Sequence, residues 1–294
     1  MYKISVICTV LNRIHDLERL TSSLINQKTD VEYEIILIDN GSTDGTAEYV
    51  NILSSSHSNI KYIDAKIFLG SPYSARNMGI KLASGEYLCF IDGYANENWV
   101  ETISKTVNNN TIMAGKIIIE VTKAASIYEI YDSIFNLDNE KIVNKYHRAP
   151  TGNLVIHRKI FDELGFFNES IRSGGDMIFT SLAYKNGYKI CYNENQISYY
   201  YARDKDAILK KQTRISKGQI NIWKSENKTT QYLLKSIIKS FIISNPIKIF
   251  SYIEKRKIIP LSFTQKLHLY LINEKMKYIM ILNNLKEFII QLGK

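Results

Sequence analysis

Cysteine is scarce in this chain of 294 residues, and its placement excludes two common roles. The three cysteines, Cys8, Cys89 and Cys191, lie far apart, and the first two stand inside apolar runs. This spacing fits neither a zinc site nor a disulfide framework. Chains without disulfides are typical of reducing compartments, so we expect a cytoplasmic protein.

Long hydrophobic runs are also missing. No apolar stretch reaches the roughly 18 residues that suggest a membrane-spanning helix. The chain opens directly on an apolar run at 4–10, which is too short and wrongly flanked for a signal peptide, so we expect no leader. With 45% hydrophobic and 11% aromatic residues and only four prolines, the composition favours a folded core over disorder.

Two glycine-rich phosphate-binding motifs are absent as well. No G-x-G-x-x-G pattern follows the first apolar run, and the chain contains no P-loop. These motifs bring backbone N–H groups against a pyrophosphate or a triphosphate. Their absence argues against an NAD-dependent enzyme and against a P-loop NTPase.

The first ninety residues do carry a regular alternation of strand and helix signals. Short apolar runs bounded by turn residues predict strands at 4–10, 33–38, 60–63 and 88–91. Apolar residues at helical spacing predict helices at 16–27, 46–53 and 74–83. Strands that alternate with helices form a doubly wound, mostly parallel sheet, so the fold class is α/β.

A carboxylate follows two of these strands. Asp39 closes the second and Asp92 the fourth, and 39–45 is rich in turn and cap formers. Ligands of open α/β sheets bind in the crevice beyond the carboxyl ends of the strands. We therefore expect Asp39 to accept from a base or ribose and Asp92 to reach a metal bound to phosphate. A simple turn or cap residue is the alternative for a lone aspartate there.

At these positions the chain resembles the family 2 glycosyltransferases, which have the GT-A fold. The matching segments are ISVICTVLNR at 4–13, YEIILIDNGSTDGT at 33–46, Gly70, SARNMGI at 74–80, ASGEY at 83–87, FID at 90–92, GN at 152–153, GFF at 165–167 and GGD at 174–176. They cover roughly residues 3–202, and their order and spacing together are specific.

The resemblance implies a site for a nucleotide-diphospho-sugar. The residues that it assigns to this donor are Thr9, Val10, Asn12, Arg13, Asp39, Ser74, Arg76, Asn77, Asp92, Gly93 and Tyr94. The residues that it assigns to the acceptor are Gly152, Asn153 and Gly175, with Asp176 as the general base. A strand at 112–121 is expected next, then a helix at 124–135 over the acceptor cleft and a loop at 148–153.

The chain departs from the family pattern at its metal motif. The D-x-D motif reads Asp92-Gly93-Tyr94 here, so a phenol replaces the second carboxylate. A histidine that relatives carry shortly after the acceptor-site helix is also missing, since that region reads SYYY at 198–201. Both changes remove ligands for Mg²⁺ or Mn²⁺.

Two alternatives follow for the cofactor. In the first, a divalent cation is held by Asp92 together with the diphosphate of the donor. In the second, the leaving group is stabilised by tyrosine hydroxyls and by cations such as Arg76, Arg203 or Lys211.

The family's Glu-Asp pair is altered to Gly175-Asp176. Asp176 keeps the carboxylate that an inverting transfer needs, because the base deprotonates the acceptor hydroxyl as it attacks the sugar. A helix N-cap is the alternative for Asp176, because 177–183 has a helical pattern.

The last 90 residues differ from the rest in charge. Residues 205–294 hold 18 Lys and Arg against five Asp and Glu, a net charge of +13, whereas the preceding 204 residues carry −4. Beyond Tyr201 no strand signal occurs. We therefore predict a GT-A glycosyltransferase domain at 1–203 and a basic, amphipathic helical region at 204–294.

The clearest helix of this basic region lies near 233–242. Its apolar face consists of Leu233, Leu234, Ile237, Ile238, Phe241 and Ile242, opposite Lys235, Ser236, Lys239 and Ser240. Pro246 ends it, and helical segments at 247–259 and 267–290 follow. Such a helix suits an anionic membrane surface, and packing on the domain is the alternative. No recognition motif points to nucleic acid.

Taken together, these features predict an inverting glycosyltransferase of surface polysaccharide synthesis. It would move a sugar from a nucleotide-diphospho-sugar to a glycan or lipid-linked acceptor, in the cytoplasm or at the inner face of the membrane. Two alternatives stay open: a catalytically silent GT-A subunit that binds sugar or serves as a scaffold, and a sugar nucleotidyltransferase, which shares the base-binding layout.

Overall fold

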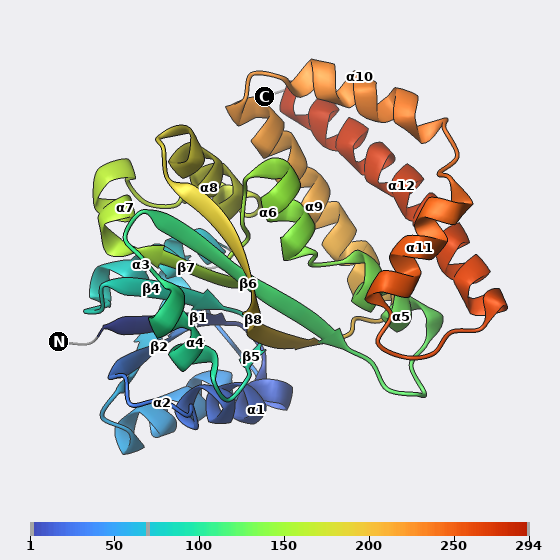
Figure 1. The fold of residues 1–294 in the computed structure, drawn as a ribbon. Coiled ribbons are helices and arrows are strands. Elements are labelled where there is room, and N and C mark those ends of the chain that lie inside the picture. Colours follow the sequence, from blue (N-terminus) through green and yellow to red (C-terminus); the bar gives the residue numbers. More distant parts are fainter. Residues whose placement is uncertain (1–2, 69–70, 293–294) are drawn as a thin grey trace. The chain divides into compact units, whose positions relative to one another are not determined.

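The computed structural model describes residues 3–68 and 71–292, so Gly70 of the family pattern lies outside the described residues. Its strands form one sheet in the order β3-β2-β1-β4-β7-β6-β8-β5 (Figure 1). The strands are β1 (Ile4–Val10), β2 (Tyr33–Asp39), β3 (Ile60–Asp64), β4 (Tyr87–Ile91), β5 (Tyr94–Ala95), β6 (Thr111–Glu120), β7 (Asn153–His157) and β8 (Lys189–Tyr201).

Helices connect and follow these strands (Figure 1). Those of the first 200 residues are α1 (Ile14–Ile25), α2 (Thr46–Ser56), α3 (Pro72–Leu82), α4 (Trp99–Thr106), α5 (Ile127–Phe135), α6 (Asn139–Tyr146), α7 (Arg158–Leu164) and α8 (Gly175–Lys185), with a 3₁₀ turn at Lys66–Phe68. The C-terminal ones are α9 (Lys205–Ser225), α10 (Thr229–Ser240), α11 (Pro246–Arg256) and α12 (Phe263–Leu292).

The first four strands are parallel, as the sequence predicts. β1 lies between β2 and β4, and β3 flanks β2. In this register Val10 stands opposite Asp39, and Ile7 stands opposite Phe90. The α/β class, these four strands and the three helices between them are confirmed at nearly the predicted bounds.

The other half of the sheet contains antiparallel pairs that the sequence analysis missed. β7 runs antiparallel to β4, with Phe90 opposite Leu154, and β6 runs antiparallel to β7. The expected loop at 148–153 is wrong at its last residue, because Asn153 begins β7. β8 was not predicted either, since its sequence KICYNENQISYYY mixes polar and apolar residues. The predicted strand at 112–121 and helix at 124–135 are confirmed as β6 and α5.

Successive side chains of a strand point to opposite faces of the sheet. Since β1 has apolar side chains on both faces, each face packs against a helix. On one face Ile7 packs with Ala75 and Ile80 of α3. On the other, Cys8 packs with Leu17 of α1. α3 approaches the sheet so closely that a Cβ at Gly79 would lie 2.5 Å from Ile38 Cδ1 and 2.9 Å from Ile7 Cγ2, so a larger residue would force these buried side chains to move.

By compactness the chain divides into two units. The first comprises the residues up to Ile117 together with Asp138–Tyr199, and the second comprises Ile118–Leu137 and Tyr200–Lys294. The predicted domain boundary after residue 203 stays a prediction.

The second unit consists mainly of helices with a core of its own. Ile130 and Ile134 of α5 share this core with Ile253 of α11 and with Leu269 and Met276 of α12. The predicted helical segments of the basic region are confirmed as α10, α11 and α12. None of the helices in 3–68 and 71–292 is both long and apolar enough to cross a membrane.

Candidate active site

Asp39 lies buried at the carboxyl end of β2 and holds the loop that follows. Its carboxylate accepts hydrogen bonds from the backbone N–H of Gly41 at 3.3 Å and from that of Ser42 at 3.1 and 3.2 Å. Gly41 has a φ of 92°, in the left-handed region that favours glycine. Asp39 thus shapes the turn at the edge where the sequence predicts the nucleotide.

The exit of β1 is joined to this loop. Thr9 and Val10 end the strand, and two residues on, Asn12 adopts a φ of 49°. Its side-chain oxygen accepts a hydrogen bond from Thr43 N at 2.8 Å, and its own N–H donates to Ser42 Oγ at 2.8 Å. Hydrogen bonds therefore join the segments that follow β1 and β2 at one edge of the sheet.

Two arginines converge on Asp92 at the end of β4. Asp92 Oδ1 accepts a hydrogen bond from Arg76 Nη2 at 2.9 Å. The Arg76 side chain is only 8% exposed, whereas that of Asp92 is 36% exposed. Arg13 donates to the carbonyl oxygen of Asp92 and is fixed by Asp16, which accepts from it at 2.6 and 3.1 Å. Two guanidinium groups, each already paired with an aspartate, are thus held at this strand end, where they could also donate to the phosphates of a nucleotide.

Tyr94, which follows Gly93, has its ring fixed by two neighbouring side chains. Its ring lies on that of Tyr199, with centroids 5.3 Å apart and planes 17° from parallel. The guanidinium carbon of Arg19 lies 3.7 Å from the centroid of the Tyr94 ring. Aromatic stacking and the cation–π contact thus fix the phenol that replaces the second carboxylate.

These residues do not make a metal site by themselves. Within 3–68 and 71–292, no three His, Cys, Asp or Glu side chains group as metal ligands. Asp92 offers one carboxylate, and one of its oxygens is already paired with Arg76. Mg²⁺ and Mn²⁺ prefer several oxygen ligands, so this donor set is too small without oxygens from a substrate.

The remaining donor-side residues of α3 face the loop after α7. Asn77 donates to the carbonyl oxygen of Phe167 and to Glu169 Oε1, both at 2.8 Å, and accepts from Phe167 N at 3.1 Å. Ser74 Oγ donates to Glu169 Oε2 at 3.3 Å. In this structure both side chains hold the segment 167–169 against α3.

The two residues predicted at the start of the acceptor side differ in their contacts. Asn153 is fully buried. Its amide accepts from Trp99 and from the side chain of Gln196, and donates to the carbonyl oxygens of Gln196 and Lys116. It thereby links β7 to its neighbours. Gly152, one residue earlier, accepts a hydrogen bond from Asp92 N at 3.4 Å through its carbonyl oxygen.

Asp176 lies in the first turn of α8 and is 8% exposed. Gly174 occupies the N-cap position, so the N-cap alternative for Asp176 is wrong. Oδ1 accepts from the Tyr73 hydroxyl at 3.0 Å and from Met177 N at 2.9 Å. Oδ2 accepts from Thr151 N at 2.9 Å and from Thr151 Oγ1 at 3.1 Å.

Sequence reasoning missed Tyr73 and Thr151, the two side chains that bind Asp176. Thr151 precedes the Gly152-Asn153 motif, and Tyr73 precedes the SARN motif, so each lies beside a residue that was identified. Neither position has a spacing of its own that points to Asp176. Their position next to a motif is the one sequence signal that could have identified them.

Two of the cations proposed for the leaving group lie in the second unit. Arg203 Nη1 pairs with the fully buried Asp132 at 3.2 Å. Lys211 Nζ is buried and has no hydrogen-bond partner among the described residues. Burial, and secondly the charge of Arg203, lower the pKa of Lys211 to about 7. Arg76, the third of these cations, lies in the first unit and is hydrogen-bonded to Asp92.

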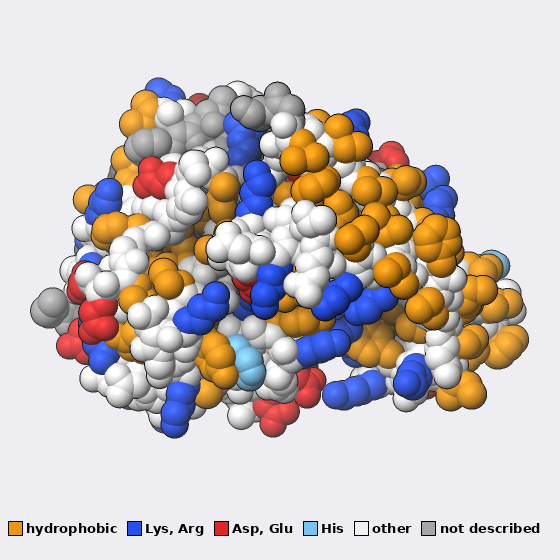
Figure 2. Space-filling model, turned by 90° about the horizontal axis from the view of Figure 1, so that it is seen from above, with side chains coloured by type: hydrophobic (Ala, Val, Ile, Leu, Met, Phe, Trp, Pro, Cys, Tyr) orange, Lys and Arg blue, Asp and Glu red, His pale blue; other side chains and the backbone are white. Residues whose placement is uncertain are grey.

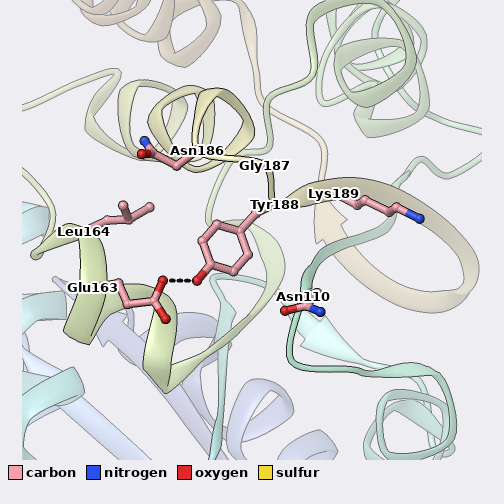
Figure 3. A pocket seen from close by; sticks show the side chains of 7 residues that line it. All are labelled: Asn110, Glu163, Leu164, Asn186, Gly187, Tyr188 and Lys189. Carbon is pink, nitrogen blue, oxygen red and sulfur yellow. Dashed lines mark hydrogen bonds between the residues drawn. The ribbon is translucent and has the colours of Figure 1, made fainter.

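A pocket of about 640 Å³ lies elsewhere in the first unit (Figure 3). Its lining residues are Asn110, Glu163, Leu164, Asn186, Gly187, Tyr188 and Lys189. The Tyr188 hydroxyl donates to Glu163, and this bond, followed by burial, raises the pKa of Tyr188 to about 12. None of the predicted site residues lines this pocket.

The fold and the site define a class before any relative is considered. They are an α/β sheet that is parallel over β1–β4, with Asp39 and Asp92 at two strand ends and a buried Asp176 in α8, as the resemblance to the GT-A glycosyltransferases implies. The family model of glycosyl transferase family 2 matches residues 5–165. The chain belongs to this family.

Relatives with assigned names are glycosyltransferases. Glycosyltransferase AglE of Haloferax volcanii is 31% identical over 225 residues, which are 75% of this chain and 74% of AglE. Poly(ribitol-phosphate) β-N-acetylglucosaminyltransferase TarS of Staphylococcus aureus is 27% identical over 218 residues, 70% of this chain but 36% of TarS. The chain is therefore a glycosyltransferase, which argues against the nucleotidyltransferase alternative.

Solved structures share the fold. The mannosyltransferase PcManGT of Pyrobaculum calidifontis, solved with GDP-Man and Mn²⁺, superposes with a TM-score of 0.60 at 14% identity, covering 97% of this chain and 87% of that one. Residues 1–349 of S. aureus TarS, solved with UDP-GlcNAc, give 0.53 at 18% identity, covering 99% and 92%. The GT-A architecture is thus confirmed.

Proposed function

We propose that this glycosyltransferase moves a sugar, with inversion, from a nucleotide-diphospho-sugar to a hydroxyl group of a glycan or lipid-linked acceptor. The observation that supports it most is the 151–152 turn. Thr151 binds the carboxylate of Asp176, and the adjacent Gly152 accepts from the backbone of Asp92. The proposed base and the proposed donor residue are thus held by neighbouring residues.

In the proposed reaction Asp176 takes the proton of the acceptor hydroxyl. The acceptor oxygen forms a bond to the anomeric carbon as the bond from that carbon to the diphosphate oxygen breaks. The electron pair of the broken bond leaves with the diphosphate. Arg76 supplies positive charge beside Asp92 where the diphosphate gains charge, and Asp39 orients the nucleoside.

The donor's nucleotide and sugar are matters for experiment. PcManGT was solved with GDP-Man and TarS with UDP-GlcNAc, so both a guanosine and a uridine donor belong in the panel. A series of nucleotide sugars, titrated calorimetrically with Mn²⁺ and with EDTA, identifies the donor. Tight binding of one nucleotide class supports the donor site, and binding of none contradicts it.

Turnover of the identified donor tests the base. We expect Asp176→Asn to lower kcat by about 10³-fold, since a general base contributes roughly 10²–10⁴-fold. Donor affinity should stay unchanged, because Asp176 is assigned to the acceptor. Donor binding without any turnover by the unmodified protein would instead favour the catalytically silent subunit.

We further propose that the second unit attaches the enzyme to an anionic membrane surface, which would place it at the cytoplasmic face. Figure 2 shows hydrophobic side chains gathered over the C-terminal helices. The most exposed near the junction of α10 and α11 are Leu234, Ile238, Phe241, Ile242, Ile243 and Ile247, at 56–79% exposure. Exposed apolar groups of this extent mark interaction surfaces.

The predicted apolar face of α10 is divided in the structure. Leu233 is buried and, with Ile237, packs in a core that includes Trp223. Leu234 and Ile238 face solvent instead. One apolar side of α10 therefore packs within the second unit, as the alternative prediction has it. The other apolar side is exposed and can contact a membrane or another molecule.

Charge favours lipid over a second protein copy as the occupant. Lys235 and Lys239 on α10 and Lys248 on α11 are exposed among these apolar residues. Apolar insertion combined with lysines is the pattern of helices that lie on anionic bilayers.

Co-sedimentation with vesicles tests this attachment. The protein should bind vesicles that contain phosphatidylglycerol and not those of phosphatidylcholine alone. The Ile238→Glu/Phe241→Glu variant should bind at least about a hundredfold more weakly, since each buried apolar side chain contributes roughly 1.5–3 kcal/mol and the variant removes two. Ile52→Glu is the matched control, because Ile52 is 69% exposed but lies on α2. Self-association through this surface, without lipid binding, would contradict the proposal.

A further inference from the structure

Gly175 occupies a position where glycine has no conformational reason to be. It begins α8 without a positive φ, and glycine weakens a helix relative to alanine. The reason is spatial, because a Cβ at Gly175 would lie 2.9 Å from Cε2 of the Tyr73 ring. The ring thus fills the space beside a residue that is glutamate in the family pattern.

Tyr73 is held firmly in this space. Its ring packs on Phe167, with centroids 5.8 Å apart, and the guanidinium carbon of Arg76 lies 5.8 Å from its centroid. Burial, and secondly the negative charge of Asp176, raise the pKa of the Tyr73 phenol. The hydroxyl therefore keeps its proton and donates a hydrogen bond to Asp176 Oδ1 at 3.0 Å.

The hydrogen bonds of Asp176 limit how it can act as a base. A carboxylate has about four acceptor positions, and Asp176 receives four donors. Two are the backbone N–H groups of Thr151 and Met177, which cannot turn away. The other two are hydroxyls, whose hydrogens rotate. An acceptor hydroxyl can reach Asp176 only if one of these hydroxyl hydrogens turns aside.

We propose that Tyr73 is the positioning residue of Asp176 and that Gly175 is glycine in order to admit its ring. This inference rests on the proposed role of Asp176 as the base. Tyr73 orients Oδ1 and stabilises the charged carboxylate until the acceptor hydroxyl takes its place. Through Arg76 the same ring adjoins Asp92, so one side chain connects the acceptor side with the donor side.

Steady-state kinetics of Tyr73→Phe over a range of pH test the proposal. The variant removes only the hydroxyl that orients Oδ1, and a base that is out of position takes the proton less efficiently, so kcat should fall about tenfold with the donor KM unchanged. The acidic limb of the pH–rate profile should move to higher pH, because a donor to the charged form is lost. Tyr188→Phe, which breaks a similar tyrosine–carboxylate bond to Glu163, is the matched control and should change neither.

Gly175→Ala provides the second measurement. In the unmodified chain the added methyl group should displace the Tyr73 ring and lower kcat to a similar extent. In a Tyr73→Ala background the same substitution should cost little further activity, because the ring is gone. Equal losses in both backgrounds would overturn the pairing.

The outcomes separate this inference from the proposed function. If Asp176→Asn is inactive and Tyr73→Phe keeps both the kcat and the pH profile of the unmodified enzyme, only the role of Tyr73 is overturned. If Asp176→Asn retains full activity, the base assignment and the role of Tyr73 fall together.

Discussion

The two units of the molecule can be compared through Asp92 and Asp176 in the first and Lys211 and Phe241 in the second. In the first unit, Asp92 is paired with Arg76, and the carboxylate of Asp176 receives four hydrogen bonds. In the second, Lys211 Nζ is buried without a hydrogen-bond partner among the described residues, and Phe241 is 78% exposed.

This difference separates two physical requirements. Charges that stabilise a transition state must be fixed before the substrate arrives, which requires satisfied partners around them. A surface that meets a membrane or another partner must keep apolar groups exposed until then. The contacts of Asp92 and Asp176 therefore fit the catalytic role proposed for the first unit, and the exposure of Phe241 fits the attachment proposed for the second.

After the loss of Asp176, removing the cation at Asp92 should have the largest effect. We expect Arg76→Leu to lower kcat/KM by about 100-fold or more, because a fixed donor at a developing charge is worth roughly 10²–10³-fold. Arg76→Lys should retain part of the activity, since it keeps the charge but loses the planar fork. Steady-state kinetics measure both, and thermal melting shows whether each variant folds. Full activity of Arg76→Leu would exclude a role of this cation in the reaction.

A second carboxylate at position 94 should create a metal site in the first unit. The Tyr94→Asp substitution restores the D-x-D pattern and gives a divalent cation a second acidic ligand beside Asp92. We expect Mn²⁺ to strengthen donor binding by about tenfold more in this variant than in the unmodified protein, as measured by calorimetry against EDTA. Tyr94→Phe, which keeps the ring between Arg19 and Tyr199, is the control. An unchanged Mn²⁺ dependence in Tyr94→Asp would show that residue 94 does not reach the cation.

Lys211 should affect the stability of the second unit through pH. Its pKa is about 7 in the folded protein and about 10.5 in the unfolded chain, so between these values the unfolded chain binds more protons. The stability of the unmodified protein should therefore rise with pH from 7 towards 10, by at most about 1.4 kcal/mol per pH unit. Lys211→Met should remove this rise. Denaturant unfolding at several pH values measures it, and parallel curves for both proteins would argue against a depressed pKa.

The sequence determined the parallel half of the sheet and the residues at its edge. Apolar runs closed by turn formers located β1 to β4, and Asp39 and Asp92 followed from the ends of two of them. These signals are local, because period and turn chemistry depend on residues a few positions apart. The basic charge and helical spacing of 205–294 located α10 to α12 in the same way.

Tertiary structure decided what surrounds those residues. Tyr73 and Asp176 are 103 residues apart, and their hydrogen bond follows from the packing of α8 beside α3. β8 was missed because its mixture of polar and apolar residues has no distinctive period, and pairing with its neighbours makes it a strand. The outward turn of Ile238 beside the buried Leu233 likewise depends on where the second core lies. Long-range packing leaves no mark in local sequence, so only the folded chain shows it.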